Sequence, residues 1–349
     1  MTVQPHTPWR RLVGLGAALA AVVTLIALAF LWPSAASDAH DLPLAVAGPA
    51  TATAPVEQGL EQRAPGTFDV VEVADRGAAE HLVLSRDVYG AIVLGDQPEI
   101  LTATASSSVV AQQLAALSPV LAQQLSEVTG TDVSVPVTDL VPLAAGDPRG
   151  TILGLVTLPI VIGGMIGGIG ISLLVVGVWR RVAAAGVYAA VGGLAVAGVL
   201  QGLFGALQGS YLVNAGIIAL TLAGIASVII GFVSIVGRAG IAIGPVLFLL
   251  VANPLASTAA PWQMLPAPWG QIGQWFPPGA AAALLRDHSY FPQASTASLW
   301  LALVGWVVLG LVLSTVGHFR NTGGATAGAI EEAEEAEGIE VGDPKAAFA

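Results

Sequence analysis

Long apolar runs dominate the pattern of this chain. They cover about residues 12–32, 152–178, 183–207, 212–236, 240–256 and 298–318, and each has at least the ~17 residues that a membrane-crossing helix needs. The run at 240–256 is the weakest, because Pro245 and Asn253-Pro254 interrupt it. We expect it inside a helix bundle, where neighbours satisfy the freed carbonyls. The pattern predicts a polytopic α-helical membrane protein with six transmembrane helices.

The first run, 12–32, resembles a signal peptide, with Arg10 and Arg11 ahead of it and Ser34-Ala35-Ala36 behind it. Its apolar stretch of about 20 residues exceeds the ~7–15 residues usual in such a segment. We therefore interpret it as an uncleaved transmembrane anchor.

Residues 33–150 break the apolar pattern. Alternating or continuous apolar stretches at 42–48, 68–74, 88–95 and 99–106 predict strands, 75–87 predicts a short helix, and "SSVVAQQLAALSPVLAQQLSEVTG" predicts a long amphipathic helix with a kink at Pro119. This alternation of strands and helices predicts an α/β extracytoplasmic domain inserted between the first and second transmembrane helices.

Arginines predict the orientation. With a cytoplasmic N-terminus, the inside receives Arg10, Arg11, Arg180, Arg181, Arg238, Arg320 and Lys345, and the outside receives Arg63, Arg76, Arg86, Arg149 and Arg286. The excess of positive residues on the inside is clearest next to the span ends, where positive charge marks the cytoplasmic side. We expect a multi-pass protein of the bacterial plasma membrane with both termini, 1–11 and 321–349, in the cytoplasm.

Composition argues against several classes of function. The chain is 55% hydrophobic and only 10% charged, it has no cysteine, and its net charge of −11 comes with no basic patch. Nucleic acid is therefore not an expected partner. No residues have catalytic, cofactor-binding or metal-ligand spacing, so we do not expect an enzyme. The spans carry no ionisable residue at their middles, which argues against a proton-driven carrier.

Glycines four residues apart mark close helix packing. They are Gly163 with Gly167, Gly164 with Gly168, and Gly198 with Gly202. We interpret these pairs as contacts within one bundle, with a dimer seam as the alternative. Arg180, Arg181 and Arg238 follow the spans on the expected cytoplasmic side, and they are the candidates for contact with a partner that couples its energy to this chain.

The stretch "FPPGAAAALLRDHSYF", 276–291, is too short to span and too apolar for an ordinary loop. Trp262, Trp269 and Trp275 precede it, and tryptophans concentrate at the headgroup level. Pro277 and Pro278 suit the first turn of a helix, and we expect Gly279 and the alanines after it to enter the outer leaflet before Arg286 returns to the headgroups. The segment 261–291 is thus predicted to be re-entrant, with an interfacial anchor as the alternative.

Together these features resemble the type-2 ATP-binding-cassette (ABC) export permeases, in particular the phage-infection-protein (Pip/YhgE-like) branch. The matching stretches are "LPLAVAG" (42–48), "DVYGAIVLG" (87–95), the five-span block in 151–320 and "FPPGAAAALLRDHSYF". The resemblance implies a permease subunit that works in lipid with a separate nucleotide-binding ATPase, since the chain has no Walker motif. It also implies a homodimer or a second permease subunit.

Two interpretations of function follow. The first is a permease-like subunit of an ABC-type export system that moves an amphipathic or envelope-related substrate. The second is a membrane scaffold or receptor whose outer domain binds a secretion component, a cell-wall polymer or a phage. The acidic tail "IEEAEEAEGIEVGD" (330–343) is typical of a solvated, disordered end, with docking of a basic partner as the alternative.

Overall fold

The structure is a computed structural model in which residues 8–320 are described. Five helical segments in this part are long and apolar enough to cross a membrane: Trp9–Pro33, Thr151–Leu174, Val178–Leu203, Tyr211–Ala242 and Ala297–Arg320. They are formed by α1 (Trp9–Ala35), α5 (Thr151–Leu155) with α6 (Thr157–Leu174), α7 (Val178–Ala197) with the π-helical η1 (Gly198–Leu203), α8 (Tyr211–Val236) with the 3-10 helix η2 (Gly237–Ala242), and α12 (Ala297–Arg320). The chain therefore has the helices of a multi-pass membrane protein. The acidic tail and residues 1–7 lie outside the described residues.

The run at 240–256 folds differently from the other five. It covers part of the 3-10 helix η2 (Gly237–Ala242), the π-helix η3 (Pro245–Ala252) and α9 (Asn253–Leu255), and the apolar helix Pro245–Leu255 is shorter than a span. Proline has no N–H to donate, so regular α-helical bonding is interrupted at Pro245 and Pro254. The segment still packs against protein, because Phe248 and Ala252 are fully buried. Within residues 8–320, five spans of full length are thus present where six were expected.

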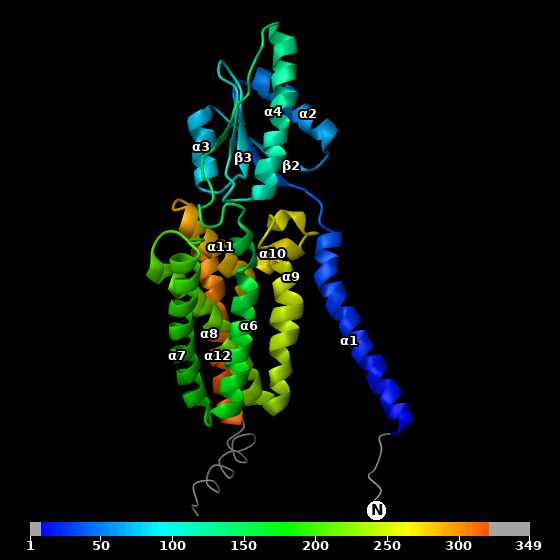
Figure 1. Ribbon diagram of the computed structural model, residues 1–349, viewed down its shortest axis with the longest axis vertical. Helices are drawn as coiled ribbons and strands as arrows, with labels where there is room; N and C mark the ends of the chain where they lie inside the picture. The colour runs from blue at the N-terminus through cyan, green and yellow to red at the C-terminus, as the bar shows by residue number, and fades with distance from the viewer. Residues whose placement is uncertain (1–7, 321–349) are drawn as a thin grey trace, which may run out of the picture.

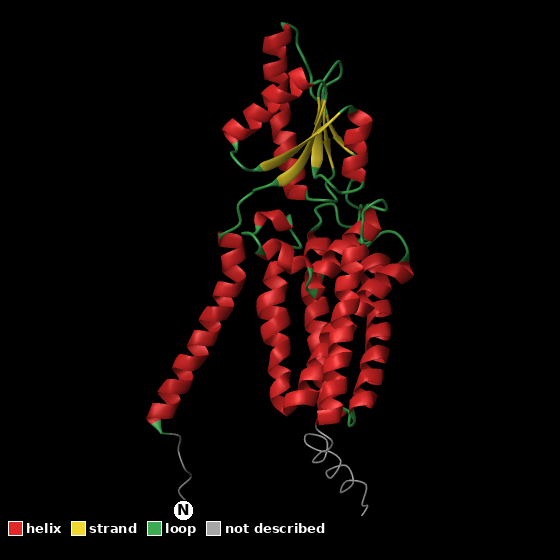
Figure 2. Ribbon diagram, turned by 180° about the vertical axis from the view of Figure 1, so that it is seen from behind, coloured by secondary structure: helices red, strands yellow, loops and turns green. Residues whose placement is uncertain are grey.

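A mixed five-stranded sheet lies between α1 and α5 in the chain (Figure 2). Its strands are β1 (Leu42–Ala47), β2 (Phe68–Val73), β3 (Gly90–Val93), β4 (Glu99–Thr102) and β5 (Val137–Asp139), in the order β2-β1-β3-β4-β5. Only the β3–β4 pair is antiparallel. The helices α2 (Ala50–Arg63), α3 (Arg76–Leu84) and α4 (Ser108–Thr129) flank the sheet. We call residues 42–139 the α/β unit.

Each face of the sheet has its own core. Leu44 and Val46 of β1 point to the face covered by Leu114 of α4, whereas Ala45 and Ala47 point to the face covered by Val83 of α3. Successive side chains of a strand point to opposite faces, so a strand buried on both sides is apolar throughout. This explains why "LPLAVA" has no polar position.

The α/β unit stands over one end of the helix bundle (Figure 1). Between them lie the 3-10 helix η4 (Trp262–Met264), α10 (Trp269–Gln274) and α11 (Pro277–Tyr290). The start of α1 and the end of α12 lie at the opposite end of the molecule. Helix α8 is the centre of the bundle, with Ile217, Ile225 and Ile229 fully buried.

Candidate functional site

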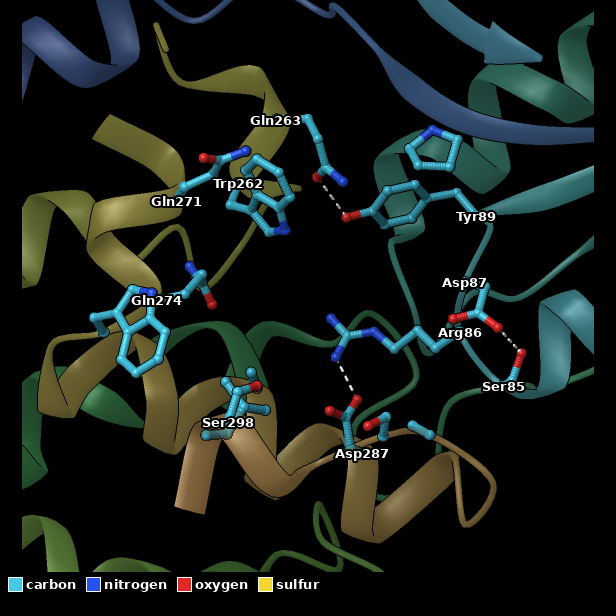
Figure 3. Close-up of a pocket in the computed structure, with 16 residues that line it drawn as sticks. Ser85, Arg86, Asp87, Tyr89, Trp262, Gln263, Gln271, Gln274, Asp287 and Ser298 are labelled. Carbon is cyan, nitrogen blue, oxygen red and sulfur yellow. Dashed lines mark hydrogen bonds and ion pairs between the residues drawn. The ribbon is translucent and has the colours of Figure 1, made fainter. Parts of the chain in front are cut away.

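A cavity of about 430 Å³ lies at the junction between the α/β unit and the bundle. Its walls come from the start of β1, the turn between α3 and β3, the segment 262–275, α11 and the start of α12. Charged, amide and indole side chains line it: Arg86, Asp87, Asp287, Gln263, Gln271, Gln274, Trp262 and Trp275 (Figure 3). Such a wall can hold a polar headgroup by hydrogen bonds and an apolar body by indole contact.

A second cavity of about 270 Å³ adjoins the first. The two share Pro43, Trp262, Gln263 and Gln271, and the second adds His40, Asp41 and Asp69 from the α/β unit. The connecting wall therefore consists of one indole, two amides and a proline. Together the two cavities extend past the N-terminal ends of β1 and β2, so a ligand larger than one headgroup can lie there.

An ion pair joins the two parts of the molecule across the cavity. Arg86, in the turn before β3, donates to the carboxylate of Asp287 in α11 (Figure 3). The side chain of Asp287 is only 6% exposed and that of Arg86 is 18% exposed. Arg86 also lies over the ring of Phe291, with its guanidinium carbon 5.8 Å from the ring centroid. Breaking such a pair would leave one charge buried without its partner.

A hydrogen bond makes a second link. The hydroxyl of Tyr89 donates to the side-chain carbonyl of Gln263 over 2.8 Å, and both side chains are buried. Burial raises the pKa of Tyr89, so the hydroxyl stays protonated and keeps its donor. Gln263 is thereby fixed in the wall of the cavity.

The last turn of α11 contacts both the α/β unit and the loops of the bundle. Arg286 donates from Nη2 to the carbonyl of Thr258 over 2.8 Å, and His288 Nε2 accepts from the backbone N–H of Ser210 over 3.0 Å. The hydroxyl of Tyr290 donates to the carbonyl of Ala206 over 2.9 Å. With Asp287, these contacts tie one helix turn to the α/β unit and to two loops of the bundle.

Arg286, which was expected to return to the level of the lipid headgroups, donates to a backbone carbonyl of the loop before η4. Burial, and to a smaller extent the charge of Arg86, lower the pKa of Arg286 to about 10. The side chain therefore remains charged at neutral pH in a partly buried place. Its Nε atom is buried and has no hydrogen-bond partner.

The Pro277-Pro278-Gly279 turn begins α11 as the sequence suggests, with both prolines in the first helical turn. All three residues are buried. A Cβ on Gly279 would lie 2.2 Å from the carbonyl oxygen of Gly273, so α10 and α11 meet where only glycine fits. The apolar residues after it, Ala280 to Ala282, Leu284 and Leu285, are also buried against protein.

The paired glycines fall into two groups. Those of α6 make close contacts: a Cβ on Gly167 would lie 2.2 Å from the ring of Tyr188 in α7, and one on Gly168 would lie 2.9 Å from Cα of Ala226 in α8. Their neighbours Gly163 and Gly164 face the same two helices through Tyr188 and Ile225. The third pair is looser, since a Cβ on Gly198 would have ordinary contact and one on Gly202 would meet nothing within 4 Å.

The arginines proposed for coupling lie at the end of the bundle away from the α/β unit. Arg180 and Arg238 are exposed. Arg181 is buried and donates from Nε to the carbonyl of Val175 over 2.6 Å, which closes the turn before α7. The guanidinium of Arg181 is thus bonded within its own turn, whereas the charges of Arg180 and Arg238 lie exposed on the surface.

Comparison with protein-family models, with curated proteins and with solved structures finds no match to this chain. The geometry of the chain is therefore the evidence for the candidate site. Sequence reasoning identified α11 but did not identify Arg86, Tyr89 or Gln263. The tryptophans around Gln263 and the "RDVYG" turn were the available signals, and nothing in them indicated that these two segments meet. Among residues 8–320 no three His, Asp or Glu side chains are grouped as metal ligands.

Proposed function

We propose that the chain is a permease-like membrane subunit that receives an amphipathic, envelope-related molecule in the cavity between the α/β unit and the bundle. A separate ATPase would supply the energy for export, as in the type-2 ABC permeases that the sequence resembles. In this proposal the α/β unit is an extracytoplasmic domain, the segment ending at Leu255 acts as the fifth of six spans, and α11 is the re-entrant helix.

The cavity carries this proposal. It combines amides and charges with two tryptophans, which is the chemistry that suits a molecule with a polar head and an apolar body. Trp275 is 58% exposed and Trp269 is 43% exposed, and exposed indoles at the end of a transmembrane bundle are typical of the headgroup level. A lipid-like molecule could therefore reach the cavity from the outer leaflet.

Photo-cross-linking tests where such a molecule binds. A photoreactive amino acid would replace Gln271, an exposed cavity residue, in the full chain in its native membrane. The control position is Val308 on the exposed face of α12. Mass spectrometry should find an amphipathic species linked at 271 and enriched over 308. The same lipid profile at both positions would contradict the proposal.

One observation favours the scaffold or receptor as a second candidate. At the end of the bundle away from the α/β unit, α6 and α7 are joined only by residues 175–177, and α8 passes directly into η2 at Gly237. This is a small surface for an ATPase. Pull-down of the full chain in mild detergent separates the two candidates: a stoichiometric P-loop ATPase supports the permease, whereas envelope or secretion proteins without one support the scaffold.

A further inference from the structure

A much smaller cavity lies behind the first one. Its volume is about 20 Å³. The walls come from the segment before α4, the loop 256–262, α11 and the turn before β3, and they include Ser106, Ser257, Ala282, Arg286 and Arg86. The space has room for about one particle of the size of a water molecule.

Two buried donors in this wall have no partner. The Oγ atom of Ser106 and the Nε atom of Arg286 are buried and make no hydrogen bond, and Ser106 is only 3% exposed. A buried polar atom without a partner costs free energy, so such atoms usually mark a bound water or ion. Helix α4 begins at Ser108, two residues after Ser106, and the start of a helix carries partial positive charge.

The charges around the cavity do not balance. Arg86 pairs with Asp287, whereas Arg286 bonds a carbonyl and has no carboxylate partner among the described residues. The cavity wall thus holds two arginines and no carboxylate, and the partly buried guanidinium of Arg286 has no ion pair there. An uncompensated buried charge is strongly unfavourable. A water molecule would satisfy the two donors but would leave that charge in place.

We infer that this cavity binds a monatomic anion, chloride, between Ser106 Oγ and Arg286 Nε. The small volume favours a single-atom anion over phosphate, sulfate and carboxylate groups, which bring three or more heavy atoms. Ser106 belongs to the α/β unit, whereas Arg286 and the loop 256–262 belong to the membrane part. A bound chloride would hold these two parts together. The inference is independent of the proposed export.

Thermal unfolding of the full chain in detergent tests this inference. The midpoint would be measured in sodium chloride, bromide, gluconate and sulfate at equal ionic strength. Chloride and bromide should raise the midpoint saturably by about 2–4 °C, because a ligand of the folded state stabilises it. Equal midpoints in all four salts would overturn the inference.

Three variants test whether the chloride effect on the unfolding midpoint arises at this cavity. Ser106→Ala removes one hydrogen bond to the anion and should raise the half-saturating chloride concentration about tenfold or more. Ser108→Ala, next to the site but outside its wall, should leave it unchanged. Arg286→Gln should abolish the chloride dependence. If that variant does not fold, Ser106→Ala still decides: an unchanged half-saturating concentration would mean that the chloride effect arises elsewhere and would overturn the assignment.

Discussion

At the scale of single residues, the carboxylate of Asp287 has the largest expected effect on stability. Replacing it in Asp287→Ala leaves the charge of Arg86 partly buried against Phe291 without a counter-charge. We expect a loss of about 3–5 kcal/mol in the free energy of unfolding. Chemical denaturation in detergent measures it, and hydrogen exchange should show α11 and β3 opening together.

An exposed ion pair in the α/β unit provides the control for this prediction. Arg76 pairs with Glu80 one turn later in α3, and the two side chains are 44% and 36% exposed. Glu80→Ala should cost less than about 1 kcal/mol, because water screens exposed pairs. A loss from Asp287→Ala no larger than that from Glu80→Ala would show that the link across the cavity contributes little.

Two glycines of the predicted packing pairs make a matched test of helix contact. Gly167→Ala places a methyl group against the ring of Tyr188, whose hydroxyl is held by the carbonyl of Gly163 at 2.7 Å. We expect a loss of about 1–3 kcal/mol from this overpacking. Gly202→Ala meets open space and should be neutral. Thermal unfolding of both variants compares them, and equal midpoints would contradict the packing in α6.

At the scale of elements, the corner between α10 and α11 shapes the cavity. Gly279→Val forces the carbonyl of Gly273 away and should displace Trp275 and Gln274, which line the cavity from α10 and the residue after it. We expect cross-linking at position 271 to fall severalfold while the chain still inserts into membranes.

The control for that corner is Gly305→Val in α12, where a Cβ meets nothing within 4 Å. Comparable cross-linking in the two variants would mean that the α10–α11 contact does not shape the site. Failure of Gly279→Val to insert would instead assign this glycine to folding rather than to the cavity.

The sequence predicted elements best where the pattern was local. The strands expected at 42–48, 68–74, 88–95 and 99–106 contain β1 to β4, and the serines before α4 include its cap, Ser107, which accepts from the N–H of Val110. Helix α2 was not predicted, because "ATATAPVEQGLEQR" has a proline inside it and little apolar periodicity. β5 has only three residues and no distinctive pattern.

The site was less predictable than the elements, because it depends on distant contacts. Arg86 and Asp287 are 201 positions apart, and Tyr89 and Gln263 are 174 apart. A single sequence shows that each segment is unusual, but pairing between segments is a property of the folded chain. For the same reason, the sequence did not indicate that a backbone carbonyl accepts from Arg286.

At the scale of the whole molecule, the arrangement of charges supports one orientation. Arg180, Arg238 and Arg320 lie at the end of the bundle away from the α/β unit, together with the start of α1 that carries Arg10 and Arg11 (Figure 1). Arginine near span ends favours the cytoplasmic side. The α/β unit and the cavity would then face outward.

The chain contains no cysteine, so single cysteines can test this orientation without background. Asp96→Cys lies on an exposed turn of the α/β unit, and Arg238→Cys lies exposed at the other end. In spheroplasts of bacteria that express the full chain, a membrane-impermeant maleimide should label position 96 at once and position 238 only after permeabilisation. Arginine retained on the inner side during insertion is the physical reason. Labelling of 238 in intact spheroplasts would reverse the orientation, and the cavity would then draw its ligand from the cytoplasmic leaflet.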